Sequence, residues 1–414
     1  MEKSFRMELA GRSLIVETGK MAKQASGAVL VRYGETVVLV TSTASKEARE
    51  GMDFFPLTVD YEEKMYAVGK MPGGFLRREG RPGNSAILNA RLIDRPIRPL
   101  FDKRCRNDIH VMATVLSVDY DNAPELCGML GASASLGISD IPWDGPIAGV
   151  RVGRVDGKFV INPTQEQLKV STLNITVAGS ETAILMVEGG AQEAPEEDVL
   201  DAIMFGHETI KELVAFQKKI IEEVGKPKRT LIFPEIPEEI KTAIYAYAER
   251  PLKEAIFNPD KLTREAHMEE VRKEAEAHFK EIYPENGSDI AECLNHLTKE
   301  IVRHMISVDK IRPDGRALDE IRPISCEVGL LPRVHGSALF TRGQTQALTI
   351  TTLAPMSETQ IIDDLTQETE KRYIHQYNFP SYSVGETKSS RGPGRREIGH
   401  GALAERALIP VIPT

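Results

Sequence analysis

The sequence predicts an α+β protein in which two related β–α domains flank a small all-helical domain, with the second related domain incomplete. Three observations favour this fold class. A β-branched segment near the N-terminus recurs 309 residues later, an Arg-Arg-Glu motif also recurs, and the intervening chain has helical periodicity without a strand signal. A length of 414 residues with 41% hydrophobic and 27% charged residues suits two or three globular domains and excludes disordered and collagen-like proteins.

The repeat begins with SGAVLVRYGETVVLVTST, from Ser26, which aligns with HGSALFTRGQTQALTITT, from His335. Both stretches alternate around one glycine, which is typical of a β-hairpin. Farther on, RRE at 77–79 recurs at 395–397, and each motif precedes a helix candidate, NSAILNARLI or GHGALAERAL. Each candidate ends at prolines: Pro96 and Pro99 in the first copy, Pro410 and Pro413 in the second. The kept order and spacing predict the duplication of a whole domain.

Between these landmarks, DIHVMATVLSVD predicts a strand and GMLGASASLGIS a helix of small residues. Two hairpins follow, with turns at Asp156-Gly157 and Gly179-Ser180, and then a helix from about Pro195 to Val224. Prolines mark a linker, and from Glu238 to about Ser307 three apolar stripes predict helices alone. The expected domain limits are 1–228, 232–308 and 312–414, the last holding about half of the first copy's fold. A half sheet with an open edge is expected to be poorly stable.

The net charge of −9 is unevenly distributed. Residues 193–310 hold 26 acidic and 17 basic side chains, whereas 70–106 hold ten basic and three acidic ones, and 386–396 hold four basic and one acidic. An acidic chain with two concentrated basic loops predicts localised anion binding and excludes a uniformly basic nucleic-acid coat.

No apolar stretch reaches the length of a membrane-spanning helix, and the N-terminus lacks the pattern of a secretory or transit peptide. Four cysteines without metal-binding spacing are expected to be buried free thiols in a reducing cytosol. They are Cys105, Cys127, Cys293 and Cys326. These features predict a cytoplasmic protein with no membrane association.

Five segments resemble the bacterial polynucleotide phosphorylase family: GKMAKQASGAVLVRYGETVVLVT, MPGGFLRREGRPG, ARLIDRPIRPLF, YIHQYNFPSYSVGE and GRREIGHGALAERAL. The resemblance covers essentially the whole chain. It implies two RNase PH-like domains, of the ribosomal protein S5 domain 2-like fold, around an all-helical domain in a ring-shaped homotrimer. It also implies reversible phosphorolysis of single-stranded RNA from 3′ ends in mRNA turnover, with release of nucleoside diphosphates.

The family further implies KH and OB-fold RNA-binding modules, which this sequence does not contain, and RNA-degradosome partners such as an endoribonuclease and a helicase. Two alternatives stay open. One is a non-catalytic RNA-binding ring subunit of the RNase PH type, and the other is a structural truncation product without RNA affinity.

The first basic loop contains Phe75, Arg77, Arg78 and Arg81 among glycines. Guanidinium groups bind phosphate oxygens bidentately, and an aromatic ring stacks on any base, which suits an enzyme that must hold RNA and let it slide. In the family the matching loop lines the aperture of the ring and grips RNA. The alternative is an ordinary exposed basic loop.

The resemblance places Arg395, Arg396 and His400 at the catalytic cleft of the second copy, in contact with the RNA backbone. It also gives Arg91 and Arg95 as a secondary anion or RNA site. The alternative there is a helix-end set of salt bridges that includes Arg98 and Asp94.

A structural role is expected for three histidines that lack metal-ligand spacing: His207, His335 and His375. The adjacent Asp363 and Asp364 are a poor metal site, since neighbours in an extended segment point to opposite faces.

In the family, the second copy supplies a Ser-Ser helix for inorganic phosphate and an Asp-x-Lys within an acidic Mg²⁺ cluster. The first copy here has Gly131-Ala132-Ser133 and Asn174-Ile175-Thr176 at the corresponding places, so it is expected to be catalytically silent. The second copy's equivalents would lie beyond residue 414. We therefore expect no metal ligands in this chain and no activity from the chain alone.

Overall fold

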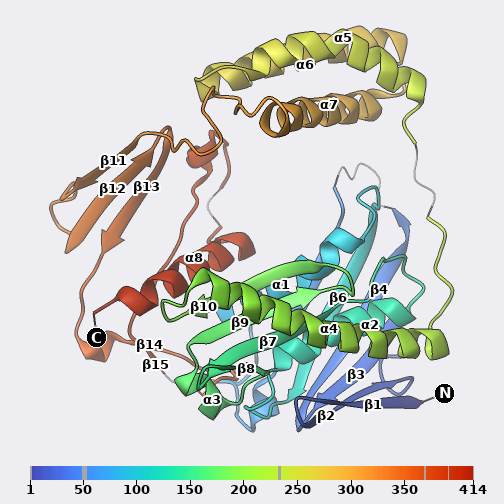
Figure 1. Ribbon diagram of the computed structural model, residues 1–414, viewed down its shortest axis with the longest axis vertical. Coiled ribbons are helices and arrows are strands. Elements are labelled where there is room, and N and C mark those ends of the chain that lie inside the picture. The colour runs from blue at the N-terminus through green and yellow to red at the C-terminus, as the bar shows by residue number, and fades with distance from the viewer. Residues whose placement is uncertain (1, 49–53, 232–234, 368–369, 390, 414) are drawn as a thin grey trace. The chain divides into compact units, whose positions relative to one another are not determined.

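The computed structural model describes residues 2–48, 54–231, 235–367, 370–389 and 391–413, and the structural statements below concern these residues. They form two compact units (Figure 1). The first unit contains Met1–Phe233 and Met356–Thr414, and the second unit contains Pro234–Pro355. The second copy of the repeat is thus divided between the units, and the domain limits expected from the sequence remain a prediction.

The first unit contains a six-stranded sheet in the order β1-β2-β3-β4-β6-β5, in which only β5 and β6 run parallel. Alternating apolar residues make one face of the central strands the core, and Val29, Val31, Val38 and Val40 are fully buried. The strands are β1 (Lys3–Leu9), β2 (Arg12–Thr18), β3 (Gly27–Tyr33), β4 (Thr36–Ala48), β5 (Leu57–Glu63) and β6 (Asn107–Ser117). The strand expected at DIHVMATVLSVD is therefore confirmed as β6.

A second, antiparallel sheet of the same unit has the order β10-β9-β7-β8. Its strands are β7 (Ala148–Val155), β8 (Lys158–Ile161), β9 (Leu173–Gly179) and β10 (Ile184–Ala191). Asp156 and Gly157 both have positive φ, 49° and 77°, which fits the tight β7–β8 turn. Both hairpins expected from the sequence are confirmed.

Helices pack on these sheets (Figure 1): α2 (Pro124–Ile138) contacts β3, β4 and β7, and α4 (Glu196–Val224) covers β7 and β9. The small residues of α2 permit this close packing, since a Cβ at Gly131 would lie 2.4 Å from Cγ2 of Val40. The remaining helices of this part are α1 (Asn84–Ile97), α3 (Gln165–Val170), η1 (Met65–Val68) and η2 (Arg98–Leu100).

The repeat is visible element by element. Both η1 and η4 (Ser381–Val384) end at a glycine in the left-handed region, Gly69 with φ 69° and Gly385 with φ 71°. Helix α1 leads into η2, just as α8 (Arg395–Leu408) leads into η5 (Ile409–Val411). The other elements here are η3 (Met356–Glu358), β14 (Gln360–Ile361) and β15 (Glu370–Lys371).

Two details of the expected repeat are wrong. The first RRE, at 77–79, lies in a loop before α1, whereas the second, at 395–397, forms the first turn of α8. The helices themselves align at an offset of 311 residues, so the two motifs are not structural equivalents. Helix α1 also runs through Pro96 and ends at Ile97, because a proline this close to the end disrupts only the last turn.

The second unit contains three helices that pack around one apolar core, α5 (Glu238–Ile256), α6 (Lys261–Ile282) and α7 (Gly287–Ser307). The expected all-helical segment is confirmed. A three-stranded antiparallel sheet follows, formed by β11 (Ile324–Val328), β12 (Gly336–Arg342) and β13 (Thr345–Thr351). Gly343 turns β12 into β13 with φ 61°, as Gly34 turns β3 into β4 with φ 57°.

Cys105, Cys127 and Cys293 are buried as expected, but Cys326 is exposed. It lies on β11, whose residues are all exposed because no helix of the described chain covers that sheet as α2 covers β3 and β4. None of the helices in the ranges given above combines the length and apolarity needed to cross a bilayer.

Candidate nucleic-acid interface

The basic loop between η1 and α1 presents its aromatic ring to solvent. The amide of Arg77 donates to the carbonyl of Gly74 at 2.9 Å, which closes a β-turn with Phe75 and Leu76 at its tip. Phe75 is 99% exposed and Leu76 82% exposed. Exposed apolar side chains of this size carry a cost in solvent, so they mark a surface that is suited to a ligand.

The loop is anchored at both ends. Lys70 Nζ donates to the carbonyl of Asp364 at 3.4 Å, and the carboxylate of Glu79 accepts from the amide of Met65 at 3.2 Å. The carboxylate of Asp363 packs against Gly73, where a Cβ would lie 2.1 Å from its Oδ2. Asp363 and Asp364 therefore contact the loop.

Three arginines surround the turn. Arg77 has φ 49° and donates to the carbonyl of Pro72 at a long 3.4 Å, whereas Arg78 and Arg81 are exposed and form no ion pair with the residues the structure describes. The structure thus brings together the four residues predicted to grip RNA. Their contact with RNA stays a prediction.

The three candidates on α8 have different surroundings. Arg395 donates from Nη1 to the carbonyl of Val59 at 2.8 Å and forms an ion pair with Asp60 through Nη2. The second oxygen of Asp60 lies 3.0 Å from Nε2 of His110. Partial burial raises the pKa of Asp60, but hydrogen bonds from Arg395 and His110 outweigh it and hold the pKa below its ordinary value.

Arg396 and His400 lie four residues apart and so share one face of α8. The ring of His400 packs edge-on against Tyr377, with 4.6 Å between centroids and 73° between planes. Arg396 is exposed, and it has no hydrogen bond or ion pair in the described part of the chain. The structure therefore groups Arg396 with His400 and turns Arg395 toward β5.

A hollow of about 190 Å³ lies between α1, β10 and α8. It is lined by Leu88, Arg91, Arg95, Glu188, Gly399, Leu403 and Arg406. Glu188 forms ion pairs with both Arg95 and Arg406, the latter at 3.0 Å. Arg91 lies against Gly399, where a Cβ would come within 2.4 Å of its Nε. Three guanidinium groups face one carboxylate, so the hollow carries excess positive charge.

Arg98 does not line this hollow. It forms a bidentate ion pair with Asp94 and donates to the carbonyl of Leu57 at 2.9 Å. The helix-end salt bridge considered in the sequence analysis therefore holds for Arg98 and Asp94, but not for Arg91 or Arg95. Sequence reasoning missed Arg406 and Glu188. The 311-residue offset of the helices, which aligns Arg406 with Arg95, is the signal that could have found the arginine.

Ser133, Asn174 and Thr176 are the first-copy residues that the sequence analysis aligns with the family's catalytic positions. The buried hydroxyl of Ser133 accepts from the amide of Ile147 at 2.9 Å, so it is not free to bind phosphate. Thr176 is buried and Asn174 exposed on β9. Within the described ranges, no group of three or more His, Cys, Asp or Glu side chains is arranged to hold a metal ion.

The other histidines singled out in the sequence have structural partners. His207 Nε2 lies 3.0 Å from the carbonyl of Ser180, and Nδ1 of His335 accepts from the amide of Leu353 at 2.8 Å. His375 Nδ1 lies 3.2 Å from the hydroxyl of Tyr373.

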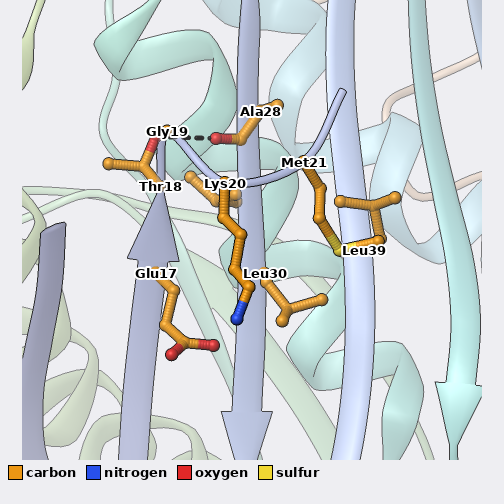
Figure 2. Close-up of a pocket in the computed structure, with 9 residues that line it drawn as sticks. Glu17, Thr18, Gly19, Lys20, Met21, Ala28, Leu30 and Leu39 are labelled. Atoms are coloured by element: carbon orange, nitrogen blue, oxygen red, sulfur yellow. Dashed lines mark hydrogen bonds between the residues drawn. The ribbon is translucent and has the colours of Figure 1, made fainter. Parts of the chain in front are cut away.

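A second hollow lies beside β2 and β3, and it is small. Figure 2 shows its walls, where Thr18 donates to the carbonyl of Ala28 at 2.8 Å and Lys20 and Met21 flank the opening. At about 10 Å³ it holds roughly one water molecule. It is not a candidate for nucleic acid.

Comparison with protein-family models identifies three matches. The model described as 3′ exoribonuclease family, domain 1, matches residues 10–142 and 320–414, and domain 2 of that family matches 145–209. The model described as polyribonucleotide nucleotidyltransferase, RNA binding domain, matches 239–317. The helical segment between the two copies therefore has a family match of its own.

Curated relatives match along the chain. The polyribonucleotide nucleotidyltransferase of Heliobacterium modesticaldum is 61% identical over 410 residues, which are 99% of this chain and 58% of that protein. Its counterpart in Syntrophomonas wolfei is 60% identical over 412 residues, or 100% of this chain and 59% of that one. The chain thus spans a little under three fifths of these relatives.

The crystal structure of rice (Oryza sativa) Rrp46 matches with a TM-score of 0.40 at 14% identity, over 53% of this chain and 94% of that one. The domain 1 family model matches both copies of the repeat and so more than half of the 414 residues. On that match, the chain belongs to the 3′ exoribonuclease family.

Proposed function

We propose that this chain is the core part of a polyribonucleotide nucleotidyltransferase, which degrades RNA from its 3′ end with inorganic phosphate and releases nucleoside diphosphates. The observation that carries the proposal is the exposed loop of Phe75 with three arginines around one turn. Relatives of that name at about 60% identity support it.

The loop suits single-stranded RNA of any sequence. Arg77, Arg78 and Arg81 can pair with backbone phosphates, and the ring of Phe75 can stack on a base without hydrogen-bonding to its edge. Because neither contact reads the base, the RNA can advance by one nucleotide after each cleavage. This is the behaviour that a processive exonuclease requires.

On α8, we propose that Arg396 and His400 contact the RNA backbone near the bond that is cleaved, with Arg395 beside them. Arg396 is exposed and can pair with a phosphate, and His400 is oriented by Tyr377. Arg91 and Arg95 are proposed as part of a secondary anion or RNA site, supported by the positive charge of the hollow they line.

Mg²⁺ and inorganic phosphate are proposed as the cofactor and co-substrate of the complete enzyme. No group of three or more metal-ligating side chains lies among the described residues, and we assign no step of the reaction to the ion. A homotrimer, a role in mRNA turnover, degradosome partners and a cytoplasmic location are further proposals, which rest on the resemblance to the family.

One observation favours a second candidate function, a non-catalytic RNA-binding subunit. The hydroxyl of Ser133 is bound to the amide of Ile147, and Thr176 is buried, so the first copy offers neither the hydroxyl nor the lysine that the family uses. Release of nucleoside diphosphates by the complete protein distinguishes an enzyme from such a subunit.

The experiment that tests RNA binding by the loop measures the salt dependence of affinity. The variant replaces Arg77, Arg78 and Arg81 with Ala, and the probe is a 5′-labelled oligoadenylate followed by fluorescence anisotropy. Each phosphate contact on a single strand contributes roughly −0.7 to the slope of log K against log salt. Loss of three contacts should flatten the slope by about 2.

The matched control removes the same charge elsewhere. Lys169 and Lys218 are exposed and Lys211 is half-buried, and each is paired with a glutamate. Their replacement with Ala lowers the net charge equally and should leave the slope unchanged. Equal slopes for the loop variant and the wild type would refute the proposed role of the loop.

A further inference from the structure

Arg395 belongs to the second copy of the repeat, but its guanidinium is held by the first copy. Nη1 donates to the main-chain carbonyl of Val59 at 2.8 Å, and Nη2 pairs with the carboxylate of Asp60. Two acceptors on one strand fix both the position and the plane of the guanidinium. Arg395 is the first residue of α8, so these bonds attach the start of that helix to β5.

Asp60 is itself held in place. Its Oδ1 receives Arg395, and its Oδ2 lies 3.0 Å from Nε2 of His110 on the adjacent parallel strand β6. The pKa of Asp60 is lowered, so the carboxylate is charged throughout the neutral range. Since each of its oxygens has a partner, Asp60 is a fixed anchor.

The bond between Arg395 and Asp60 determines where the following residues of α8 point. Arg396 follows Arg395 by one residue, about 100° farther around the helix, and His400 lies one turn beyond it on the same face. The ring of Tyr377 packs edge-on against His400. The bonds of Arg395 therefore place the helix turn that carries Arg396, since Arg396 has no partner of its own within the described ranges.

We propose that Asp60 is a positioning residue for RNA binding: by holding Arg395 it orients Arg396 and His400 toward the RNA backbone. Arg395 then acts through Asp60 and makes no contact with a phosphate. This inference rests on the proposed RNA-binding function of α8, and it assigns to the first copy a residue on which the second copy's site depends.

The test compares three variants, Asp60→Ala, Arg395→Ala and the double variant, in binding of 5′-labelled oligoadenylate. Each single change should weaken binding about threefold to tenfold, and the double change should weaken it no further, because both remove the same link. The salt slope should fall by the same amount in all three, and by no more than roughly 0.7, because each loses at most the contact of Arg396. Arg396→Ala should lower it by roughly 0.7, as the loss of one phosphate contact does.

Two further variants separate positioning from other roles. Exchange of the pair, Asp60→Arg with Arg395→Asp, restores an ion pair and should recover part of the affinity, although it places a carboxylate at position 395. Lys371→Ala removes one positive charge and one ion pair, with Glu405, from another part of α8. As the matched control, it should leave affinity and slope unchanged.

Hydrogen exchange of one amide in α8 tests the positioning role of Asp60 without RNA. The amide of Ile398 donates to the carbonyl of Gly394 at 3.1 Å in the first turn of α8, and its hydrogen exchange should become faster in Asp60→Ala and in Arg395→Ala. Unchanged exchange would overturn the positioning role, whatever RNA does. A salt slope that is lowered in Arg395→Ala but not in Asp60→Ala, or tighter binding in Asp60→Ala, would also overturn it, because Arg395 would then be a phosphate contact for which Asp60 competes.

The proposed RNA-binding function and the positioning role of Asp60 would be refuted by different results. If Arg396→Ala and the triple variant of the basic loop both bind RNA as the wild type does, the proposed function is wrong. If those variants lose affinity while Asp60→Ala does not, the proposed function stands and the positioning role of Asp60 is wrong.

Discussion

Glu63, the last residue of β5, should make the stability of the fold depend on pH near neutrality. Burial raises the pKa of its carboxyl from 4.5 to about 7, opposed by a hydrogen bond from Ser85 Oγ at 2.9 Å and reinforced by the charges of Asp364 and Glu125. The folded-state pKa thus lies above the unfolded value. The contribution to stability is complete below about pH 4.5 and is lost as the pH rises through about 7.

The size follows from the two pKa values. At 1.36 kcal/mol for each pH unit of difference, full ionisation of Glu63 costs the fold about 3 kcal/mol. Glu63→Gln keeps an acceptor for Ser85 and removes the charge. Relative to the wild type, this variant should gain about 2–3 kcal/mol of unfolding free energy between pH 5 and pH 8.

Urea denaturation at both pH values, followed by circular dichroism, measures this difference. Glu62→Gln is the matched control, since Glu62 lies on the same strand but pairs with Lys64 near the surface. Its difference from the wild type should not follow the same pH course. If the stability difference between Glu63→Gln and the wild type is the same at pH 5 and pH 8, the burial argument for Glu63 is wrong.

Three further outcomes are expected. Lys228 donates to three carbonyls at the C-terminal end of α2 at 2.8–2.9 Å, so Lys228→Met should cost about 1–3 kcal/mol in urea denaturation, and Lys228→Arg less. Gly27→Ala would place a Cβ 2.0 Å from the carbonyl oxygen of Ser135 and should lower the melting temperature by several degrees, whereas Gly74→Ala, with open space around it, should not. With phosphate, Mg²⁺ and RNA, the 414-residue chain alone should release nucleoside diphosphates no faster than a blank, as measured by chromatography; robust release would reveal a catalytic group in the first copy.

The sequence predicts most of the fold because its signals are local. The hairpin of β3 and β4 follows from alternating β-branched residues around Gly34, and the helices of the second unit follow from their apolar stripes. The residue offset between the two copies is less well predicted. An identical RRE triplet suggested an offset of 318, whereas the helices align at 311, because the first triplet belongs to a turn.

The candidate site could be predicted only in part, for a similar reason. Phe75 and the arginines of its loop are adjacent in the chain, so composition alone predicts an exposed basic surface. The partners of Arg395 and Arg406 lie more than 200 residues away, and no local pattern indicates a pairing at that distance. Those distant partners determine which arginines contact the protein and which stay free to bind RNA.

Glu188 is shared by two side chains that the duplication made equivalent, Arg95 and Arg406. Such sharing should make the three positions change together during evolution. A relative that replaces Glu188 with a neutral residue leaves the guanidinium groups of this hollow without a counter-charge, and repulsion then favours loss of an arginine from α1 or α8. An alignment of relatives should therefore show position 188 varying jointly with both 95 and 406, across two copies that otherwise diverge independently.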